Sequence, residues 1–263
     1  MNRVVIVTGA SSGIGLEASK MFYEAGDKVI CMSRKAQGEV GDLVECDISS
    51  GESVKKAIEY VIEKYGRIDV LVNNAGMGIS GAFETQDIED IRKQFDVNLI
   101  GSIQMMQAVL PYMRKNGGGR IINTSSVASR VGIPFQSFYS ASKSALDTVS
   151  FALQAEVAEF NIKITNVLPG DTKTGFTKNR IKQEESKADV YSSKMVRSVE
   201  TMEKDEQNGM SPKDIAKTIY KVSLKKNPPL FVVVGVKYKM LALGIKLLPT
   251  KLVNKVIGKM YVK

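Results

Sequence analysis

Histidine is absent from this chain of 263 residues. Its absence excludes most zinc sites, the Ser-His-Asp and Cys-His nucleophile arrangements, and a histidine general base. Any proton transfer must therefore use tyrosine, lysine, aspartate or glutamate side chains. We expect no metal site.

Cysteine and long apolar runs are also scarce. The two cysteines, Cys31 and Cys46, both lie in apolar strand-like runs, so we expect reduced core residues of an intracellular protein. The first apolar run, Val4–Val7, is too short for the core of a signal peptide. The run that comes nearest to a membrane span, Leu230–Val236, is under half the required length. These features predict a cytoplasmic protein.

Acidic residues are missing from the last part of the chain. From Lys221 to the end there are ten lysines and no aspartate or glutamate. The net charge of the whole chain is +9, so the other residues together carry −1. These lysines alternate with leucine, isoleucine and methionine, and the segment has no arginine for reading bases. We therefore expect no nucleic acid partner, and a membrane or protein surface instead.

Within a predicted tail, residues 237–263, apolar and basic residues recur at helical spacing on different faces. This pattern predicts a basic amphipathic helix, which can lie on an anionic membrane or pack on protein. The apolar positions are Leu252, Val253, Val256, Ile257 and Met260, and the basic ones are Lys251, Lys255 and Lys259.

Residues 1–236 alternate short apolar runs with segments of helical period. Short runs that are almost continuously apolar are typical of parallel strands buried on both faces. The alternation predicts one α/β domain, a doubly wound Rossmann-type sheet of seven parallel strands with helices on both faces. The expected strands are Val4–Val7, Val29–Met32, Leu43–Cys46, Val70–Val72, Arg120–Asn123, Lys163–Val167 and Leu230–Val234. The expected helices are 14–25, 51–65, 87–115, 138–160 and 212–226, with Ser50, Asp87 and Ser211 as N-caps.

One internal segment departs from this alternation. Residues 170–209 are charged and poor in apolar periodicity. A segment of that length inside a compact domain is usually functional or mobile. We expect a partly helical substrate flap.

A glycine-rich turn follows the first strand and opens the first helix. Glycines let the backbone approach a pyrophosphate, which then lies at the helix N-terminus where free N–H groups favour anions. A strand before the turn and a helix after it are the context that supports a dinucleotide site. The expected contacts are Gly9, Ser11, Ser12, Gly13, Ile14 and Gly15.

The end of the second strand bears on which dinucleotide binds. An acidic residue there normally holds the 2′-hydroxyl of the adenosine ribose. The chain instead has Ser33, Arg34 and Lys35, and an arginine can pair with a 2′-phosphate. The sequence therefore favours NADP(H) over NAD(H). Further residues expected to line the crevice are Asp47, Ile48, Asn74, Ala75 and Gly76.

Several separated motifs occur in one order: TGASSGIG, NNAG, Asn98 within DVNLIG, Ser126, Tyr139 and Lys143. Tyr139 and Lys143 form a Tyr-xxx-Lys pair, and Ser126 stands thirteen residues before the tyrosine. This set resembles the classical short-chain dehydrogenase/reductase family over about residues 1–170.

The resemblance implies particular roles for several residues. Lys143 would hold the nicotinamide ribose, Asn98 would hold a water that relays protons, and Thr172 would contact the nicotinamide carboxamide. Pro169 and Gly170 complete a further family-like element. The resemblance also implies homodimers or homotetramers that pack through the helices at 87–115 and 138–160.

The chemistry of the Tyr-Lys pair can be argued from the residues alone. Tyr139 and Lys143 are four apart on a predicted helix, so they share a face. An ammonium about 4 Å from the phenolate would contribute roughly 4 kcal/mol. That would lower the pKa of Tyr139 from about 10 to near 7, where a general acid–base works best. Ser126 would hydrogen-bond the substrate oxygen as negative charge develops on it.

The implied reaction is hydride transfer between nicotinamide and a carbonyl carbon, or the reverse oxidation of a secondary alcohol. Apolar residues near the tyrosine and in the flap suit a steroid, an acyl chain or another lipophilic ketone, although packing of the flap would also explain them. Two alternatives remain: a 3-oxoacyl-thioester reductase of fatty-acid synthesis, and an NADP-binding redox sensor without turnover. The candidate wall residues are Val131, Ile133, Pro134, Phe135, Phe138, Phe176, Ile181, Tyr191, Met195 and Val196.

Overall fold

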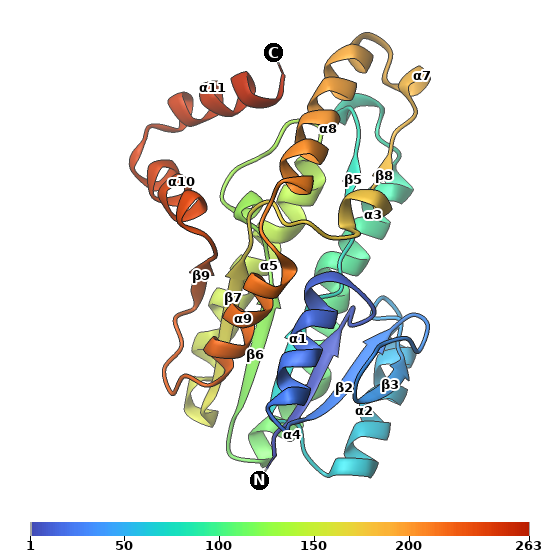
Figure 1. Ribbon diagram of the computed structural model, residues 1–263, viewed down its shortest axis with the longest axis vertical. Helices are drawn as coiled ribbons and strands as arrows, with labels where there is room; N and C mark the ends of the chain where they lie inside the picture. The colour runs from blue at the N-terminus through green and yellow to red at the C-terminus, as the bar shows by residue number, and fades with distance from the viewer. Residues whose placement is uncertain (1, 263) are drawn as a thin grey trace.

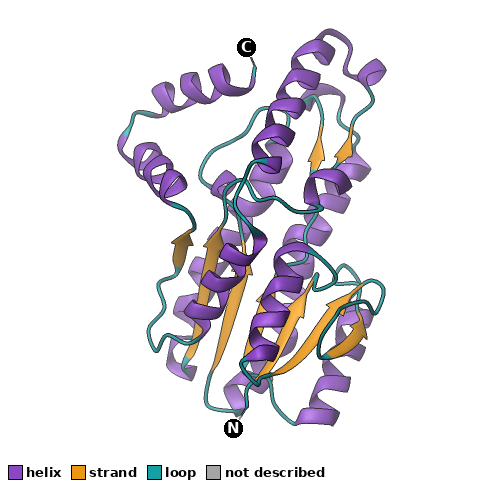
Figure 2. Ribbon diagram, viewed as in Figure 1, coloured by secondary structure: helices purple, strands orange, loops and turns teal. Residues whose placement is uncertain are grey.

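The computed structural model describes residues 2–262 and has a parallel sheet at its centre (Figures 1 and 2). Seven strands pair in the order β3-β2-β1-β4-β6-β7-β9, all parallel. This confirms the predicted fold class. The strands are β1 (Val4–Thr8), β2 (Lys28–Ser33), β3 (Asp42–Glu45), β4 (Val70–Asn73), β6 (Gly119–Thr124), β7 (Ile162–Leu168) and β9 (Phe231–Val233).

Helices cover both faces of this sheet. Apolar residues of α1 and α9 pack against one face, where Phe22 and Ile219 are fully buried. Residues of α2, α4 and α5 pack against the other, around Met105 and Leu146. The bounds are α1 (Gly13–Glu24), α2 (Gly51–Tyr65), α4 (Gly101–Lys115), α5 (Ser137–Glu156) and α9 (Pro212–Ser223).

The three predicted N-caps are confirmed. The side chains of Ser50, Asp87 and Ser211 accept hydrogen bonds from backbone N–H groups in the first turns of α2, α3 (Ile88–Phe95) and α9. Such bonds satisfy donors that a helix leaves without partners. These short-range signals therefore fix where three helices begin.

The predicted helix 87–115 is not continuous α-helix. It consists of α3 (Ile88–Phe95), a π-helical turn (Asp96–Ile100) and α4. A π-turn accommodates one extra residue in a helical turn, and such turns occur frequently at functional sites. Here the turn carries the buried Asn98.

Two other helices end earlier than the sequence predicts. The helix α5 ends at Glu156 and is followed by a 3-10 helix, Ala158–Phe160, while α9 ends at Ser223. Both differences concern the last turn, where hydrogen bonding changes from α to 3-10 or stops.

Residues 170–209 contain several short elements and one long helix, α8 (Ser192–Gln207). The strand β8 of this segment pairs in parallel with β5, which follows β4 in the chain. The segment is thus attached to the main domain by backbone hydrogen bonds. The remaining elements here are α6 (Phe176–Asn179), β8 (Ile181–Lys182), α7 (Glu185–Ala188), β5 (Ile79–Ser80), and 3-10 helices at Phe83–Thr85, Val127–Ser129 and Asp189–Tyr191.

The tail forms two helices, α10 (Val236–Leu247) and α11 (Thr250–Tyr261). Figure 1 shows them in red beyond β9, at one edge of the sheet, with α11 running toward α8. Tail helix α10 starts at Val236, one residue before the predicted boundary. No helix within residues 2–262 has both the length and the apolar character that crossing a membrane requires.

Candidate active site

A cavity of about 1420 Å³ lies at the carboxyl ends of the strands. In an open parallel sheet, ligands bind at that edge, where the strand order reverses. Of the predicted site residues, only Gly15 and Asn98 do not line it. The cavity brings together Gly9, Ser11, Ser12, Gly13, Ile14, Ser33, Arg34, Asp47, Ile48, Asn74, Ala75, Gly76, Ser126, Tyr139, Lys143, Pro169, Gly170 and Thr172.

The first turn requires glycine because its backbone is left-handed at Gly9 and because neighbouring atoms leave no space for a Cβ at Gly9 or Gly15. Gly9 has φ +64°, and a Cβ there would lie 2.8 Å from the Cα of Ala75. A Cβ on Gly15 would overlap the carbonyl oxygen of Gly9. Gly15 therefore acts inside the turn, and not on the cavity wall as its predicted role required.

The N-terminus of α1 opens into the cavity, which Ser12, Gly13 and Ile14 line. Its N-cap, Ser12, makes no side-chain capping bond, and the first turn contains no acidic residue. Unpaired N–H groups and the positive end of the helix dipole favour an anion. This arrangement fits the pyrophosphate of a dinucleotide.

The cavity becomes basic beyond the end of β2. Arg34 and Lys35 are exposed and line it, while the Ser33 hydroxyl donates to the carbonyl of Lys35 at 2.7 Å. Across from them Asp47 accepts two bonds from Ser49, which are the main cause of its lowered pKa, and Arg34 lowers that pKa further.

The phenol of Tyr139 lies deep in the cavity wall. Burial raises its pKa to about 12, and a hydrogen bond with the Ser126 side chain opposes the rise. Its ring contacts Phe176, with centroids 5.7 Å apart. Tyr139 and Ser126 are thus adjacent, as the spacing predicts, and the phenol is held in its protonated form at neutral pH.

Lys143 is 5% exposed, and its ammonium donates to the carbonyl of Thr124 at 2.9 Å. Its Nζ lies 6.0 Å from the centroid of the Tyr139 ring. Burial lowers the pKa of Lys143 to about 8. The predicted fall of the Tyr139 pKa to near 7 is not seen: burial raises the pKa of the phenol, and the ammonium of Lys143 is directed at the end of β6.

Asn98 is fully buried beside Lys143, with its side chain bonded to the protein. Its Oδ1 accepts from the N–H of Met77 at 2.8 Å, and its Nδ2 donates to the Met77 carbonyl and to Ser142. A Cβ on Gly76 would lie 3.3 Å from Asn98 Oδ1 and 3.6 Å from Lys143 Nζ. In this structure Asn98 anchors the loop after β4 to α5, and its role with a water stays a prediction.

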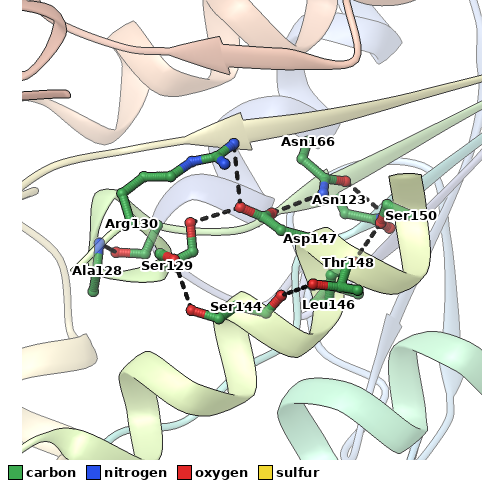
Figure 3. A network of polar contacts seen from close by, with 11 residues as sticks. Asn123, Ala128, Ser129, Arg130, Ser144, Leu146, Asp147, Thr148, Ser150 and Asn166 are labelled. Carbon is green, nitrogen blue, oxygen red and sulfur yellow. Dashed lines mark hydrogen bonds and ion pairs between the residues drawn. The ribbon is translucent and has the colours of Figure 1, made fainter. Parts of the chain in front are cut away.

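A buried polar network supports these residues (Figure 3). The side chain of Asn123 on β6 donates to Asn166 on β7 and to Ser150 on α5. Asn166 then donates to Asp147 on α5 at 2.7 Å, and Asp147 accepts from Ser129 at 2.6 Å. The network joins the helix that carries Tyr139 to the strands and the loop that carry Ser126.

Sequence reasoning missed this network. Its signal is a polar residue inside an otherwise apolar strand run, as with Asn123 after Ile121 and Ile122. A buried polar residue needs hydrogen-bond partners, and Asn123 has them in Asn166 and Ser150.

The loop after β7 is also fixed by local bonds. The Pro169 carbonyl accepts from the N–H of Val127 at 2.9 Å, and the Thr172 hydroxyl donates to the Gly170 carbonyl at 2.8 Å. Thr172 also forms a parallel bridge with Met210. The loop is therefore held against the Ser126 turn.

Apolar side chains also line the cavity. Four of the ten candidate wall residues line it: Val131, Ile133, Phe176 and Ile181. The other six, which include Pro134, do not. Phe135, Met195 and Val196 belong to a separate small core, Phe138 stacks on Phe83, and Tyr191 donates to Glu84.

The tail contributes to the cavity, which the sequence did not reveal. Tyr238, Leu241, Ile257, Met260 and Tyr261 line it. These contacts join residues distant in sequence, so no local pattern could predict them.

Tyr238 has a particular place among these tail residues. It donates to Asp171 at 2.6 Å, and its ring fills the space that a Cβ on Gly170 would need. It therefore packs α10 on the loop that holds Thr172.

Comparison with known proteins agrees with this geometry. A family model described as short chain dehydrogenase matches residues 3–185. The chain is 43% identical over 236 residues to the 3-ketodihydrosphingosine reductase of Bacteroides thetaiotaomicron, covering 89% of this chain and 88% of that protein. It is 32% identical over 253 residues to a probable short-chain type dehydrogenase/reductase, VdlC, of Helicobacter pylori, covering 94% and 93%. A short-chain dehydrogenase structure from Streptomyces avermitilis superposes with a TM-score of 0.86 at 29% identity, covering 98% and 95%. Fold, motifs and relatives agree, and the chain belongs to the short-chain dehydrogenase family of NAD(P)-dependent oxidoreductases.

Proposed function

We propose that the protein is an NADP(H)-dependent reductase of a lipophilic ketone, with Tyr139 as the general acid. The observation that carries the proposal is that one cavity is lined by Arg34, by Tyr139 and Ser126, and by apolar side chains such as Val131, Ile133 and Phe176. Arg34 suits a dinucleotide with an extra phosphate, and the apolar side chains suit a lipophilic ketone.

The residues that would hold the cofactor follow from the donors described above. The turn from Gly9 to Ile14 and the N-terminus of α1 would bind the pyrophosphate, and Arg34 would bind the 2′-phosphate. Lys143 would hold the nicotinamide ribose, and Thr172 the carboxamide. When bound, the nicotinamide supplies the hydride.

The protein's own part in reduction is to bind the ketone oxygen and to give it a proton. Ser126 would donate a hydrogen bond to that oxygen as charge grows on it. Tyr139 is protonated at neutral pH, since its pKa is raised to about 12, so it would deliver its phenolic proton to the oxygen.

For the substrate we propose a long-chain ketone, in preference to a steroid. The relative from Bacteroides, 43% identical, is named for 3-ketodihydrosphingosine. A panel of 3-ketodihydrosphingosine, a steroid ketone and a 3-oxoacyl thioester, followed by NADPH absorbance, tests this choice. A higher kcat/KM for the thioester would favour the fatty-acid alternative.

The substitution Tyr139→Phe tests the mechanism. Loss of a positioned acid typically costs on the order of 10²–10⁴ in rate, so kcat should fall by that amount. Affinity for NADPH, measured by fluorescence, should change little. Tyr60→Phe, at a surface tyrosine that contacts Asp42, is the matched control. Turnover that persists in Tyr139→Phe would refute the proposal, and a wild-type chain that binds NADPH but reduces no ketone would favour the redox sensor.

The substitution Arg34→Ala tests the cofactor choice. A charge-assisted hydrogen bond is worth about 1.5–3 kcal/mol, so KM for NADPH should rise roughly 10- to 100-fold. KM for NADH should change little, because NADH has no 2′-phosphate. Arg114→Ala, an exposed arginine at the far end of α4, should leave both values unchanged. Equal losses for the two cofactors would remove Arg34 from this role.

We further propose a homodimer or homotetramer that packs through α4 and α5. The exposed Phe151 of α5, at 64% exposure, supports this interface, since large apolar side chains on a helix face favour association. Phe151→Lys should lower the mass measured by light scattering, whereas Tyr23→Lys on α1 should not. An unchanged mass for Phe151→Lys would contradict the interface.

A further inference from the structure

The tail hairpin, which we define as α10 and α11 (residues 236–261), forms part of the cavity wall with one of its sides. Tyr238 and Ile257 are buried there, at 7% and 5% exposure. Lys237, Leu241, Met260 and Tyr261 are the other hairpin residues that line the cavity. Anything that moves this hairpin therefore changes access to Tyr139.

The opposite side of α10 is apolar as well. Val236, Met240, Leu243 and Leu247 are spaced four, three and four residues apart, so they form one stripe along the helix. Their exposures are 75%, 70%, 57% and 71%. The helix α10 is therefore apolar on two sides, but only one side is buried. The other side is available to bind a partner.

The helix α11 also exposes apolar side chains and flanks them with charge. Leu252 and Val256, each 44% exposed, lie four residues apart. Lys251 and Lys255 immediately precede them, and Lys259 follows four residues later. Leu248, 45% exposed, lies in the connection between the helices, so apolar side chains extend from α10 to α11.

We propose that the outer side of the tail hairpin binds an anionic lipid bilayer, and that the ketone passes from the bilayer under the hairpin into the cavity. The route rests on the proposed function, whereas the docking surface does not. Apolar side chains enter the interface between headgroups and acyl chains, while neighbouring lysines contact acidic headgroups. Charge favours this partner, because the segment from Lys221 onward carries ten lysines and no carboxylate side chain.

The same charges argue against a second copy of this chain as the partner. In a twofold interface the same patch faces itself, so the lysines of two hairpins would be brought together. Like charges placed opposite each other disfavour association. An anionic surface neutralises all of them.

Flotation with vesicles tests the docking surface without any turnover. The full chain should float with vesicles of phosphatidylcholine containing about a third phosphatidylglycerol, and only weakly with phosphatidylcholine alone. Replacing Lys246, Lys251, Lys255 and Lys259 together by glutamine should weaken binding at least 100-fold, since each lysine near an anionic surface contributes about fivefold.

The triple variant Met240→Gln, Leu243→Gln, Leu247→Gln should weaken binding at least tenfold, because it removes apolar area that would enter the bilayer. None of these three residues lines the cavity. The matched control is Ile88→Gln, Val190→Gln, Leu224→Gln, at exposures of 58%, 75% and 57%, and it should bind as the wild type does.

Three results would overturn the proposal: no flotation of the wild type, equal flotation of the tail and control variants, or a tail variant that changes the oligomeric mass while the wild type ignores vesicles. The last would assign the surface to a second copy of the chain.

The route is tested by comparing a long-chain ketone embedded in vesicles with a short, water-soluble ketone. The triple tail variant should reduce the embedded ketone at least tenfold more slowly and the soluble one at the wild-type rate. Equal rates for the embedded ketone would refute the route. If the wild type floats but reduces neither ketone, the proposed function fails and the docking surface stands.

Discussion

Replacing Lys143 by methionine should stabilise the protein while abolishing its activity. Lys143 is 5% exposed, and burial lowers its pKa from 10.5 to about 8. One pKa unit corresponds to about 1.4 kcal/mol, so holding the charged amine in the folded protein at neutral pH costs about 3 kcal/mol. Methionine has a similar length and carries no charge to bury.

The sign of the pH dependence follows from the direction of the shift. Between pH 8 and pH 10.5 the unfolded chain binds a proton at Lys143 that the folded chain has lost. The stability of the wild type therefore rises with pH through this window, and the cost is fully present below it. Methionine removes that cost and also the bond to the Thr124 carbonyl, worth about 1 kcal/mol. The expected net gain at pH 7 is about 2 kcal/mol, or about 4 °C in Tm.

Urea unfolding of the wild type and of Lys143→Met at several pH values measures this effect. The advantage of the variant should be largest at pH 7 and should shrink as the pH rises from 8 toward 10.5. Lys194→Met, at an exposed position on α8, is the control and should show neither effect. A variant that is less stable than the wild type at pH 7, or an advantage independent of pH, would refute the reasoning.

Three further outcomes are expected. The reductase kcat/KM should fall above pH 8 as Lys143 loses its proton, and a rate that rises through this range would show that the neutral amine or a Tyr139 phenolate is the active form. Asp147→Ala should lower the free energy of unfolding by about 3 kcal/mol, because it removes a buried acceptor from two donors; chemical denaturation measures this, and a loss under 1 kcal/mol would contradict it. Tyr238→Phe should raise KM for NADPH several-fold with Tm lowered by only a few degrees, since the bond to Asp171 positions the loop of Thr172; an unchanged KM would limit Tyr238 to packing.

The sheet could be predicted from the sequence because its strands are apolar on both faces. The runs at Val4–Val7 and Val70–Val72 each differ from the observed strand by one residue. The N-caps could be predicted for a related reason, since a capping side chain bonds to a backbone group two or three residues away. Both signals depend only on residues that are close together in the sequence, so they can be recognised without the structure.

The π-turn and α10 could not be predicted in the same way. The π-turn at Asp96–Ile100 changes the helical register by one residue, which an average over several turns conceals. Residues of α10 are apolar on two opposite sides, Tyr238 and Leu241 inward and Met240 and Leu243 outward. Such a helix has no single apolar stripe, so periodicity does not mark it.

The motif spacing placed Tyr139, Ser126 and Lys143 in one cavity but did not give their electrostatics. Four residues along a helix bring two side chains to one face, but this spacing does not say where a long amine is directed. The amine of Lys143 reaches the Thr124 carbonyl on a strand far away in sequence. The direction of the Tyr139 pKa shift therefore depends on tertiary contacts, which the motif spacing does not show.

The buried charge and the buried polar network have a common consequence for the site. A buried ammonium costs stability, and asparagines in the core contribute less than apolar residues of the same size would. Both features fasten α5 to the ends of β6 and β7: Lys143 binds Thr124, and Asp147 binds Asn166. Directional bonds fix the rotation and the height of a helix on a sheet, which apolar contacts alone leave adjustable. Since Tyr139 lies on α5 and Ser126 lies two residues after the end of β6, these bonds set the separation of the phenol and the serine hydroxyl. The protein is thus less stable than it would be with an apolar core here, but the phenol of Tyr139 is held in a defined position.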